Sequence, residues 1–239
     1  MCTLSFVPGP IRGGFVVAMN RDEKRTRSRA LPPATVDFVS TRAVFPREST
    51  GGTWIAANDA GTCLALINWH RIEREPPDEI VSRGQVVPAL IGKSSAATIS
   101  AGIREMPLRK VRPFRLIAVI APDQVLIEWR WDLRVLTRRK HPWRLQHWFS
   151  SGFDEPGAAW SRRRVCREAR KRASATGVEW LRRLHRSHSP VRGPFSICMH
   201  RNEAKTVSYT EVTFVPRRVT MRYRSGSPCS ASSTITKSL

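Results

Sequence analysis

Short apolar stretches separated by Gly, Pro, Asn and Asp recur along the chain, a pattern typical of antiparallel strands joined by turns. Near the start, residues 2–7 and 15–19 are apolar and flank a loop rich in Pro and Gly. Residues 53–57 and 62–68 form a second pair, joined by a segment whose Asn, Asp and Gly favour tight-turn conformations. The pattern therefore predicts two successive hairpins.

Alternation and helical spacing define the other elements. Strands are predicted at residues 114–121, 125–131, 133–137, 145–150, 195–199, 206–214 and 217–223. Helices are predicted where apolar residues recur at helical spacing or good helix formers predominate, at residues 82–91, 96–103, 160–173 and 177–188. Residues 24–49 are polar and contain Pro, so we expect a surface loop there.

Consecutive predicted strands are joined by short turns rather than by crossover helices, which favours antiparallel sheets with helices packed outside them. At 239 residues, the chain is long enough to bury one sizeable core. We predict an α+β fold with a single domain over residues 1–224 and a loose, Ser/Thr-rich tail over residues 225–239.

A composition of 41% hydrophobic and 25% charged residues argues against a disordered, collagen-like or coiled-coil chain. The longest apolar run, residues 116–122, is far too short to span a membrane. Residues 1–10 lack a basic segment followed by a long apolar stretch, so we expect no secretory signal and a cytoplasmic location. Five cysteines without a CxxC pair fit neither a disulfide framework nor a four-thiolate zinc site, so we expect free thiols.

A formal net charge of +22 is large enough to attract nucleic acid, anionic lipid or acidic metabolites. One interpretation is an anion- or RNA-binding surface on the arginines of residues 161–186, which predicts binding with a steep salt dependence. Zinc-finger spacing, RNP-like aromatic runs and basic heptads are missing from the sequence, however. The ratio of 34 Arg to 7 Lys also fits a coding bias, so we expect no specific nucleic-acid partner.

Cys2 follows the first methionine, and removal of that methionine is usual when the next residue is small. Cleavage leaves Cys2 with both a thiol and a free α-amine. Because the α-amine has a pKa of ~7.7–8.0 and the thiol one of ~8.5, the amine can accept the thiol proton at neutral pH. The sequence thus offers a nucleophile and its base in one residue, and the alternative is an inert cysteine.

The first predicted hairpin brings a charged segment back to the start of the chain. In its simplest register Cys2 lies opposite Asn20, the first residue of the run Asn20-Arg21-Asp22-Glu23. There, Arg21 would lower the pKa of the thiol and Asp22 would hold the amine. The alternative is that this polar run merely ends a strand.

Four motifs stand in order along the chain: Met1-Cys2-Thr3, Asn20-Arg21-Asp22-Glu23, Gly51-Gly52-Thr53-Trp54 and Asn68. Together they resemble the NRDE family, which is named for the second motif and has transport and Golgi organisation protein 2 as its best-known member. Weaker likeness continues through Ser82-Arg83-Gly84, Ser150-Ser151 with Trp160, and residues 206–212. The resemblance implies an N-terminal-nucleophile hydrolase-like fold, a four-layer αββα sandwich of two mostly antiparallel sheets with helices outside.

The resemblance also implies residue roles. In the related cysteine amidases, the choloylglycine hydrolase and penicillin V acylase group, an N-terminal Cys attacks an amide with help from nearby Arg and Asp. By that analogy Cys2 is the nucleophile, Arg21 and Asp22 support it, and Asn68 lies near the reacting carbonyl. The other motif residues receive supporting positions: Asn20, Glu23, Gly52, Thr53, Ser150 and Ser151. Ser150-Ser151 stand where those amidases have an Asn for the oxyanion. The implied substrate is a small-molecule amide, with neither cofactor nor metal.

Two residues of the third motif have a structural interpretation. Gly51 is typical of a strand start where another backbone approaches closely. Trp54 is typical of a core residue rather than of a ligand contact.

The competing hypothesis is a non-enzymatic carrier, because the resemblance also implies secretory organisation or haem trafficking. Haem is a cofactor only under this alternative. The candidate axial ligands are His70, His147, His185, His188, His200 and Tyr209, none of which stands in a haem-attachment motif.

Overall fold

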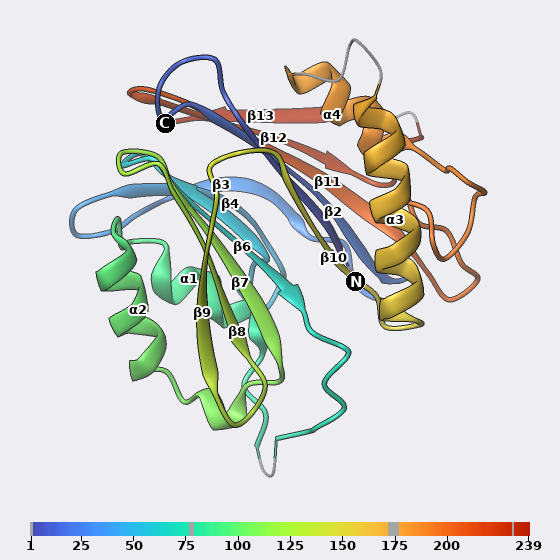
Figure 1. Ribbon diagram of the computed structural model, residues 1–239. Helices are drawn as coiled ribbons and strands as arrows, with labels where there is room; N and C mark the ends of the chain where they lie inside the picture. Colours follow the sequence, from blue (N-terminus) through green and yellow to red (C-terminus); the bar gives the residue numbers. More distant parts are fainter. Residues whose placement is uncertain (1, 77–78, 172–176, 231) are drawn as a thin grey trace.

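Two antiparallel sheets stack against each other, and helices cover the outer face of each (Figure 1). The computed structural model describes residues 2–76, 79–171, 177–230 and 232–239. The layers run helix, sheet, sheet, helix, so the expected αββα sandwich is confirmed.

Among the described residues, the first sheet has six strands in the order β10-β1-β2-β11-β12-β13, and all neighbours are antiparallel. Its strands are β1 (Cys2–Pro8), β2 (Phe15–Lys24), β10 (Gln146–Ser150), β11 (Ala204–Val215), β12 (Arg218–Ser225) and β13 (Thr234–Ser238). The first predicted hairpin is confirmed as β1 and β2. Because β10 pairs with the other side of β1, the first strand of the chain lies inside the sheet.

The second sheet follows the chain order from β3 to β9 and is also antiparallel. Its strands are β3 (Leu31–Asp37), β4 (Arg42–Arg47), β5 (Ile55–Asn58), β6 (Thr62–Asn68), β7 (Phe114–Ile120), β8 (Val125–Trp131) and β9 (Leu136–His141). The second predicted hairpin is confirmed as β5 and β6.

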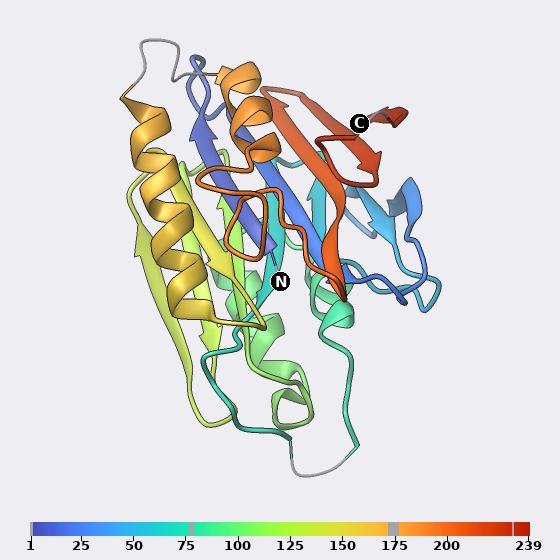
Figure 2. The same ribbon diagram turned by 90° about the vertical axis from the view of Figure 1, so that its right-hand side faces the viewer.

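Short helices η1 (Arg83–Gln85), α1 (Val86–Leu90), α2 (Ala96–Glu105) and η2 (Leu108–Lys110) accompany the second sheet, and α3 (Glu155–Arg170) and α4 (Gly177–Arg186) cover the first (Figure 2). α3 begins before the predicted residue 160. The Asp154 carboxylate accepts a hydrogen bond from the Gly157 amide (2.8 Å), and Pro156 lies in the first turn, so the helix is capped there. The predicted end of this helix, Ala173, lies outside the described residues.

Side-chain alternation sends the apolar residues of β1 to one layer and its small polar residues to another. Cys2, Leu4 and Phe6 enter the core between the sheets, whereas Thr3 and Ser5 face the side covered by α3 and α4. A second core lies between the other sheet and α1–α2, and a third lies under α3 and α4. The sandwich thus places one face of β1 between the sheets and buries small polar residues on its other face.

The predicted surface loop at residues 24–49 is wrong, because β3 and β4 form there. Pro32 and Pro33 obscured the strand pattern. They are tolerated because β3 lies at the edge of the sheet and its pairing shifts between Leu31 and Ala34, where Pro needs no ladder hydrogen bond. β4 pairs on both sides and has a buried centre.

Three other boundaries differ from the sequence-based expectation. Residues 234–238 of the expected tail pair with β12 as an edge strand, since alternating Thr and Ile suit a strand once β12 offers its free edge. Residues 195–199 form no regular strand. Their apolar side chains are buried, but the Cys198 amide donates to the Ser187 carbonyl in a loop. β9 starts at Leu136 rather than 133, because the Asp132 carboxylate caps the turn before it.

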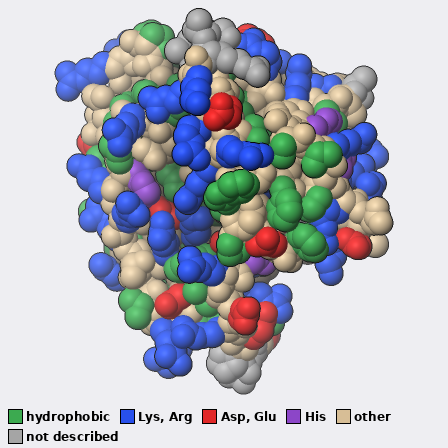
Figure 3. Space-filling model, turned by 45° about the vertical axis from the view of Figure 1, so that its right-hand side comes forward, with side chains coloured by type: hydrophobic (Ala, Val, Ile, Leu, Met, Phe, Trp, Pro, Cys, Tyr) green, Lys and Arg blue, Asp and Glu red, His purple; other side chains and the backbone are tan. Residues whose placement is uncertain are grey.

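Lys and Arg side chains are spread over the face shown in Figure 3, in accord with the net charge of +22. Within the residues that the structure describes, we find no helix whose length and apolar character would let it cross a membrane.

Candidate active site

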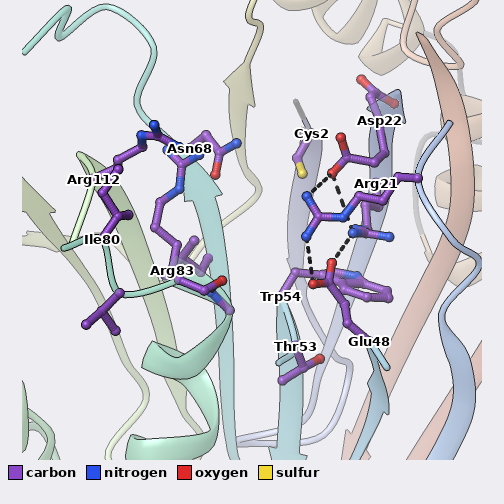
Figure 4. A pocket seen from close by; sticks show the side chains of 16 residues that line it. Cys2, Arg21, Asp22, Glu48, Thr53, Trp54, Asn68, Ile80, Arg83 and Arg112 are labelled. Atoms are coloured by element: carbon purple, nitrogen blue, oxygen red, sulfur yellow. Dashed lines mark hydrogen bonds and ion pairs between the residues drawn. The ribbon is translucent and has the colours of Figure 1, made fainter. Parts of the chain in front are cut away.

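A cleft of about 290 Å³ opens between the two sheets at the start of β1 (Figure 4). One wall carries Cys2, Arg21 and Glu48, and the facing wall carries Asn68 and Arg83. The further lining residues are Asp22, Glu23, Arg27, Thr53, Trp54, Leu66, Ile80, Val81, Ser82, Gly84 and Arg112. The cleft therefore gathers all four residues that the resemblance assigned to catalysis.

Strand pairing sets which side of the sheet each residue of the Asn-Arg-Asp-Glu run faces. Cys2 lies opposite Arg21, one residue beyond the expected Asn20. Residues directly opposite in an antiparallel pair share a face, so Arg21 and Glu23 lie on the cleft side with Cys2. Asn20 lies on the opposite face of the sheet and projects towards α4, where it bonds to His185.

Arg21 is held flat against the cleft wall. Its guanidinium lies 4.3 Å from the centre of the Trp54 ring and forms ion pairs with Glu48 and Glu23. Arg27 bonds to both of these carboxylates from the more exposed side, at 2.7 Å from Glu48 and 3.2 Å from Glu23. This network fixes a positive charge beside Cys2. Trp54 belongs both to the core between the sheets and to the cleft wall.

Asp22 is buried beneath Cys2, in contact with a second arginine. Its carboxylate lies 3.3 Å from the Arg162 guanidinium and accepts a hydrogen bond from the Thr206 hydroxyl at 2.6 Å. Arg162, on α3, has no exposed surface and also donates to the Cys2 carbonyl (3.4 Å) and to Thr3 Oγ1 (3.1 Å). Asp22 therefore anchors the arginine that positions the backbone of Cys2.

Sequence reasoning missed Arg162. It is the first of three consecutive arginines, Arg162 to Arg164, of which the next two are exposed. A helix in this segment was predicted, but nothing in the local pattern distinguishes a buried arginine from its solvated neighbours.

Asn20 links β2 to the layer above it. Its side-chain amide donates to the carbonyls of His185 and Ile197 at 2.9 Å each, and its oxygen lies 3.1 Å from His185 Nδ1. His185 Nε2 lies 2.9 Å from Ser5 Oγ, which in turn lies 2.8 Å from His147 Nδ1. Burial lowers the pKa of His185 to about 3 and that of His147 to about 4, so both rings are neutral at pH 7.

Cys2 itself is a protonated thiol in this environment. Burial raises its pKa and the Asp22 carboxylate adds to the rise, while the charge of the chain's N-terminus, Arg21 and the backbone amide of Asp22 act in the opposite direction. Arg21 thus lowers the pKa of the thiol as expected, but burial outweighs it. A base must therefore remove the proton before Cys2 can act as a nucleophile.

The facing wall carries two arginines, Arg83 and Arg112, and Arg112 forms an ion pair with Glu75 at 2.6 Å. Asn68, at the end of β6, points into the cleft beside Arg83 and Arg112 (Figure 4). Arg83 donates to the Pro113 carbonyl at 3.1 Å. Burial and the nearby Arg112 lower the pKa of Arg83 to about 10, which leaves it charged at neutral pH. An anionic group on a ligand would meet this wall.

Gly52, rather than the expected Gly51, provides the close backbone approach. A Cβ on Gly52 would lie 3.1 Å from the Gly84 Cα, and the Thr53 amide donates to the Gly84 carbonyl at 2.9 Å. Gly51 instead adopts φ +82° with open space around it, which favours glycine for its backbone conformation alone. Gly52 and Thr53 thus hold the segment of Arg83 against the start of β5.

Ser150 flanks Cys2 on the side opposite Arg21. In the pairing of β1 with β10, Ser150 lies directly opposite Cys2, and Ser150 is fully buried. Its hydroxyl has no hydrogen-bond partner within the described part of the chain. Ser151 is also buried, and its hydroxyl accepts a hydrogen bond from the Phe153 amide at 3.3 Å. Ser150 is thus the member of the pair that lies beside the thiol.

The profile of the family described as Transport and Golgi organisation 2 matches residues 1–151. The chain belongs to the transport and Golgi organisation 2 family. This match contains Cys2, the Asn-Arg-Asp-Glu run, the glycine pair and both serines, and ends before Arg162. A search of curated proteins found no significant match.

This transport and Golgi organisation 2 family chain shares its fold with a penicillin V acylase and a conjugated bile acid hydrolase. Penicillin V acylase from Agrobacterium tumefaciens has a TM-score of 0.58 at 9% identity, with 99% of this chain and 85% of the other covered. A mutant of conjugated bile acid hydrolase from Clostridium perfringens has a TM-score of 0.58 at 8% identity, with 99% and 96% covered. At such low identity the similarity establishes the fold alone.

The six haem-ligand candidates lie in three places: His147, His185 and Tyr209 together, His70 by itself, and His188 with His200. His147 and His185 belong to the network under Asn20, and Tyr209 is buried with its hydroxyl donating to Glu211 at 2.9 Å. His70 is half-buried, and its amide donates to Glu155 at 2.8 Å. His188 and His200 lie together beside two cysteines, outside the cleft.

Proposed function

We propose that this protein is an N-terminal-cysteine hydrolase that cleaves a non-peptide amide C–N bond in a small anionic substrate. The observation that carries the proposal is the placement of the Cys2 thiol in a cleft, with Arg21 beside it and Asn68 on the facing wall. The hydrolase names of the fold neighbours, an acylase and a conjugated bile acid hydrolase, agree with this chemistry.

In the proposed reaction, removal of Met1 exposes the α-amine of Cys2. The amine takes the thiol proton, and the thiolate attacks the substrate carbonyl carbon while Asn68 and backbone N–H groups hydrogen-bond the developing oxyanion. The C–N bond then breaks, the protonated α-amine returns its proton to the leaving amine, and an acyl thioester forms on Cys2. Water, deprotonated by the α-amine, attacks the thioester and releases the carboxylic acid and the thiol.

The surroundings of Cys2 suit these steps. A buried thiol with a raised pKa needs a base close by, and an α-amine on the same residue supplies it without a second side chain. Arg162 bonds to the Cys2 carbonyl and holds the backbone of the nucleophile in place. Arg21 then stabilises the thiolate once it forms.

The two arginines of the facing wall indicate the substrate class. Arg83 and Arg112 lie across the cleft from Cys2, so a substrate carboxylate on that side would form charge-assisted hydrogen bonds. We therefore expect N-acyl compounds that bear a carboxylate to be preferred over the matching neutral esters or amides.

The first experiment is intact-mass analysis of untagged protein before and after brief treatment with a thiol-reactive electrophile at neutral pH, with peptide mapping. The expected result is loss of Met1 and much faster labelling of Cys2 than of Cys63 or Cys166, whose pKa values burial raises. Retention of Met1, or labelling of Cys2 no faster than the other thiols, would contradict the proposed nucleophile.

The second experiment is a hydrolysis screen of carboxylate-bearing amides with matched variants. Cys2→Ala should abolish turnover of any substrate found, and Arg83→Met should remove the preference for the carboxylate. Arg109→Met, at an exposed position outside the cleft, is the control and should retain both. Unchanged turnover in Cys2→Ala would refute the mechanism, and unchanged preference in Arg83→Met would refute the substrate class.

The carrier hypothesis makes a different prediction. Stoichiometric haem should shift the Soret band of the protein, and a His→Ala variant at the axial ligand should abolish that shift. A flat titration would reject haem carriage and leave the hydrolase proposal untouched.

A further inference from the structure

Two histidines and two cysteines meet on the far side of the first sheet from the cleft. They are His188, Cys198, His200 and Cys229, and the ligating atoms of all four lie within 4.8 Å of one another. His188 follows α4, Cys198 and His200 lie in the irregular segment before β11, and Cys229 lies in the loop between β12 and β13. None of these residues has a part in the proposed hydrolysis.

Three of the six separations, those measured from His200 Nε2, match the edges of a tetrahedral zinc site, and the other three are no longer than 4.8 Å. His188 Nε2 lies 3.2 Å from His200 Nε2, which lies 3.6 Å from Cys198 Sγ and 3.4 Å from Cys229 Sγ. A tetrahedron with Zn–S of about 2.3 Å and Zn–N of about 2.0 Å has N···N edges of about 3.3 Å and N···S edges of about 3.5 Å. The four atoms therefore stand close to where the ligands of one ion would stand.

We propose that His188, Cys198, His200 and Cys229 bind one Zn²⁺ in a closed, structural Cys₂His₂ site. The two thiols lose their protons to solvent when the ion binds, so two thiolates and two neutral imidazoles surround Zn²⁺ with no net charge. That neutrality matters here, because Arg25, Arg192 and Lys205 raise the local positive potential. Four protein ligands leave no position open for water, which is the arrangement of a structural rather than a catalytic site.

The backbone around the site is held in place independently of any metal. The Cys198 amide donates to the Ser187 carbonyl at 3.0 Å, and the Ser227 hydroxyl donates to the Thr206 carbonyl at 2.6 Å. The Thr206 amide also donates to the Met199 carbonyl at 2.9 Å, so the three segments that supply the ligands are tied together. Cys229 is exposed while Cys198 is buried, which gives the ion a path from solvent to an interior ligand.

Binding through Nε2 of His200 requires the ring proton on Nδ1. Nδ1 lies 3.4 Å from the Arg192 guanidinium, which can only donate. Arg192 is exposed, so its side chain is free to turn into solvent as zinc binds.

The site escaped sequence reasoning because its ligands fit no standard spacing. The expectation of free cysteines rested on the missing CxxC pair and excluded a four-thiolate site only. Here one residue separates Cys198 from His200, and the other two ligands come from separate segments. A mixed set of this kind is recognisable only after folding.

The test is the zinc content of untagged, full-length protein from zinc-supplemented cultures, measured by mass spectrometry after removal of loosely bound metal. One zinc per chain is expected. Cys198→Ser and Cys229→Ser should each lower zinc affinity at least about tenfold in competition with a chelator. Cys166→Ala, which removes a buried cysteine of α3 outside the cluster, is the control and should keep one zinc.

A second measurement covers the case in which the variants fail to fold. Apoprotein titrated with Co²⁺ should develop the intense visible bands of tetrahedral cobalt and thiolate-to-cobalt charge transfer, saturating at one equivalent. A wild-type protein without stoichiometric zinc, or a weak octahedral cobalt spectrum, would overturn the proposal. So would a Cys198–Cys229 disulfide in protein purified with reductant. None of these outcomes depends on whether Cys2 is a nucleophile.

Discussion

The cleft-facing side of the β1–β2 hairpin carries charged side chains at an opening to solvent, whereas its helix-facing side carries polar side chains sealed under α3 and α4. Arg21 and Glu23 on the cleft side pair with other charged residues at the rim. Asn20 and Asp22 on the helix side are buried and bond to the layer above. A single four-residue run therefore serves two layers, because strand side chains alternate between faces.

This difference separates the energetic roles of the two faces. The Arg21 side chain is only 7% exposed, but it lines a cleft of about 290 Å³ that has room for water, so a partner left without it can be hydrated there. We therefore expect its replacement to change the chemistry of Cys2 more than the free energy of unfolding. A polar group sealed under the helices is out of reach of water. Its replacement therefore leaves its former partner buried without a hydrogen bond, which lowers the free energy of unfolding. The predictions below test this separation.

Arg162→Met should have the largest effect, lowering the free energy of unfolding by about 3–5 kcal/mol in urea denaturation. The reason is that Asp22, with no exposed surface, would lose its buried cation. Arg163→Met is the matched control on the same helix and should stay within about 0.5 kcal/mol of wild type, because Arg163 is exposed. Equal effects from the two variants would mean that the Asp22–Arg162 pair contributes no more to the free energy of unfolding than an exposed arginine does.

Two serines of neighbouring strands provide the next comparison. Ser5→Ala should cost about 1–3 kcal/mol, because it leaves His147 Nδ1 and His185 Nε2 without their shared hydroxyl. Ser150→Ala removes a buried hydroxyl that has no partner in the described structure and should change stability by less than about 0.5 kcal/mol. Chemical denaturation measures the free energy of unfolding of both variants. A larger loss in Ser150→Ala than in Ser5→Ala would contradict the expected difference between the two faces.

Arg21→Met should slow electrophile labelling of Cys2 about tenfold at neutral pH, the change that one unit of pKa produces. Without the guanidinium, the pKa of the thiol rises further. Arg27→Met is the control, since Arg27 pairs with the same carboxylates but is about half exposed and is not a cause of the shift at Cys2. A labelling rate that falls equally in both variants would attribute the effect to the ion-pair network rather than to Arg21.

The buried histidines should make stability fall with acid. The folded-state pKa of His185, about 3, lies below the usual value of 6.5, so the unfolded chain binds more protons between these values. Its contribution to stability is complete above pH 6.5 and declines below it by about 1 kcal/mol per pH unit. His185→Gln should reduce that slope between pH 6.5 and 5 and leave the slope between pH 8 and 7 unchanged. A slope that does not change would place the acid sensitivity elsewhere, for example at His147.

Local patterns in the sequence accounted for the strands of both hairpins and for α2, α3 and α4 to within a few residues. They failed at strands whose polar, Pro-containing or Ser/Thr-rich sequences resemble those of loops, and at an apolar segment that joins no sheet. β3 and β13 are edge strands whose pairing comes from β4 and β12, and residues 195–199 are apolar but have no ladder to join. Burial of apolar side chains was predictable, but the backbone partner was not.

What the sequence determined by itself about the site is its chemistry and its family: the nucleophile candidate Cys2, the charged run that returns beside it, and Asn68. Only the tertiary structure decided which face each residue serves. Register and alternation sent Arg21 to the cleft and Asp22 to the buried side, and helix packing selected Arg162 from three adjacent arginines. Packing likewise assembled the two histidines and two cysteines of the proposed zinc site. Long-range pairing and burial depend on contacts between segments far apart in the chain, and no local pattern of residue types encodes them.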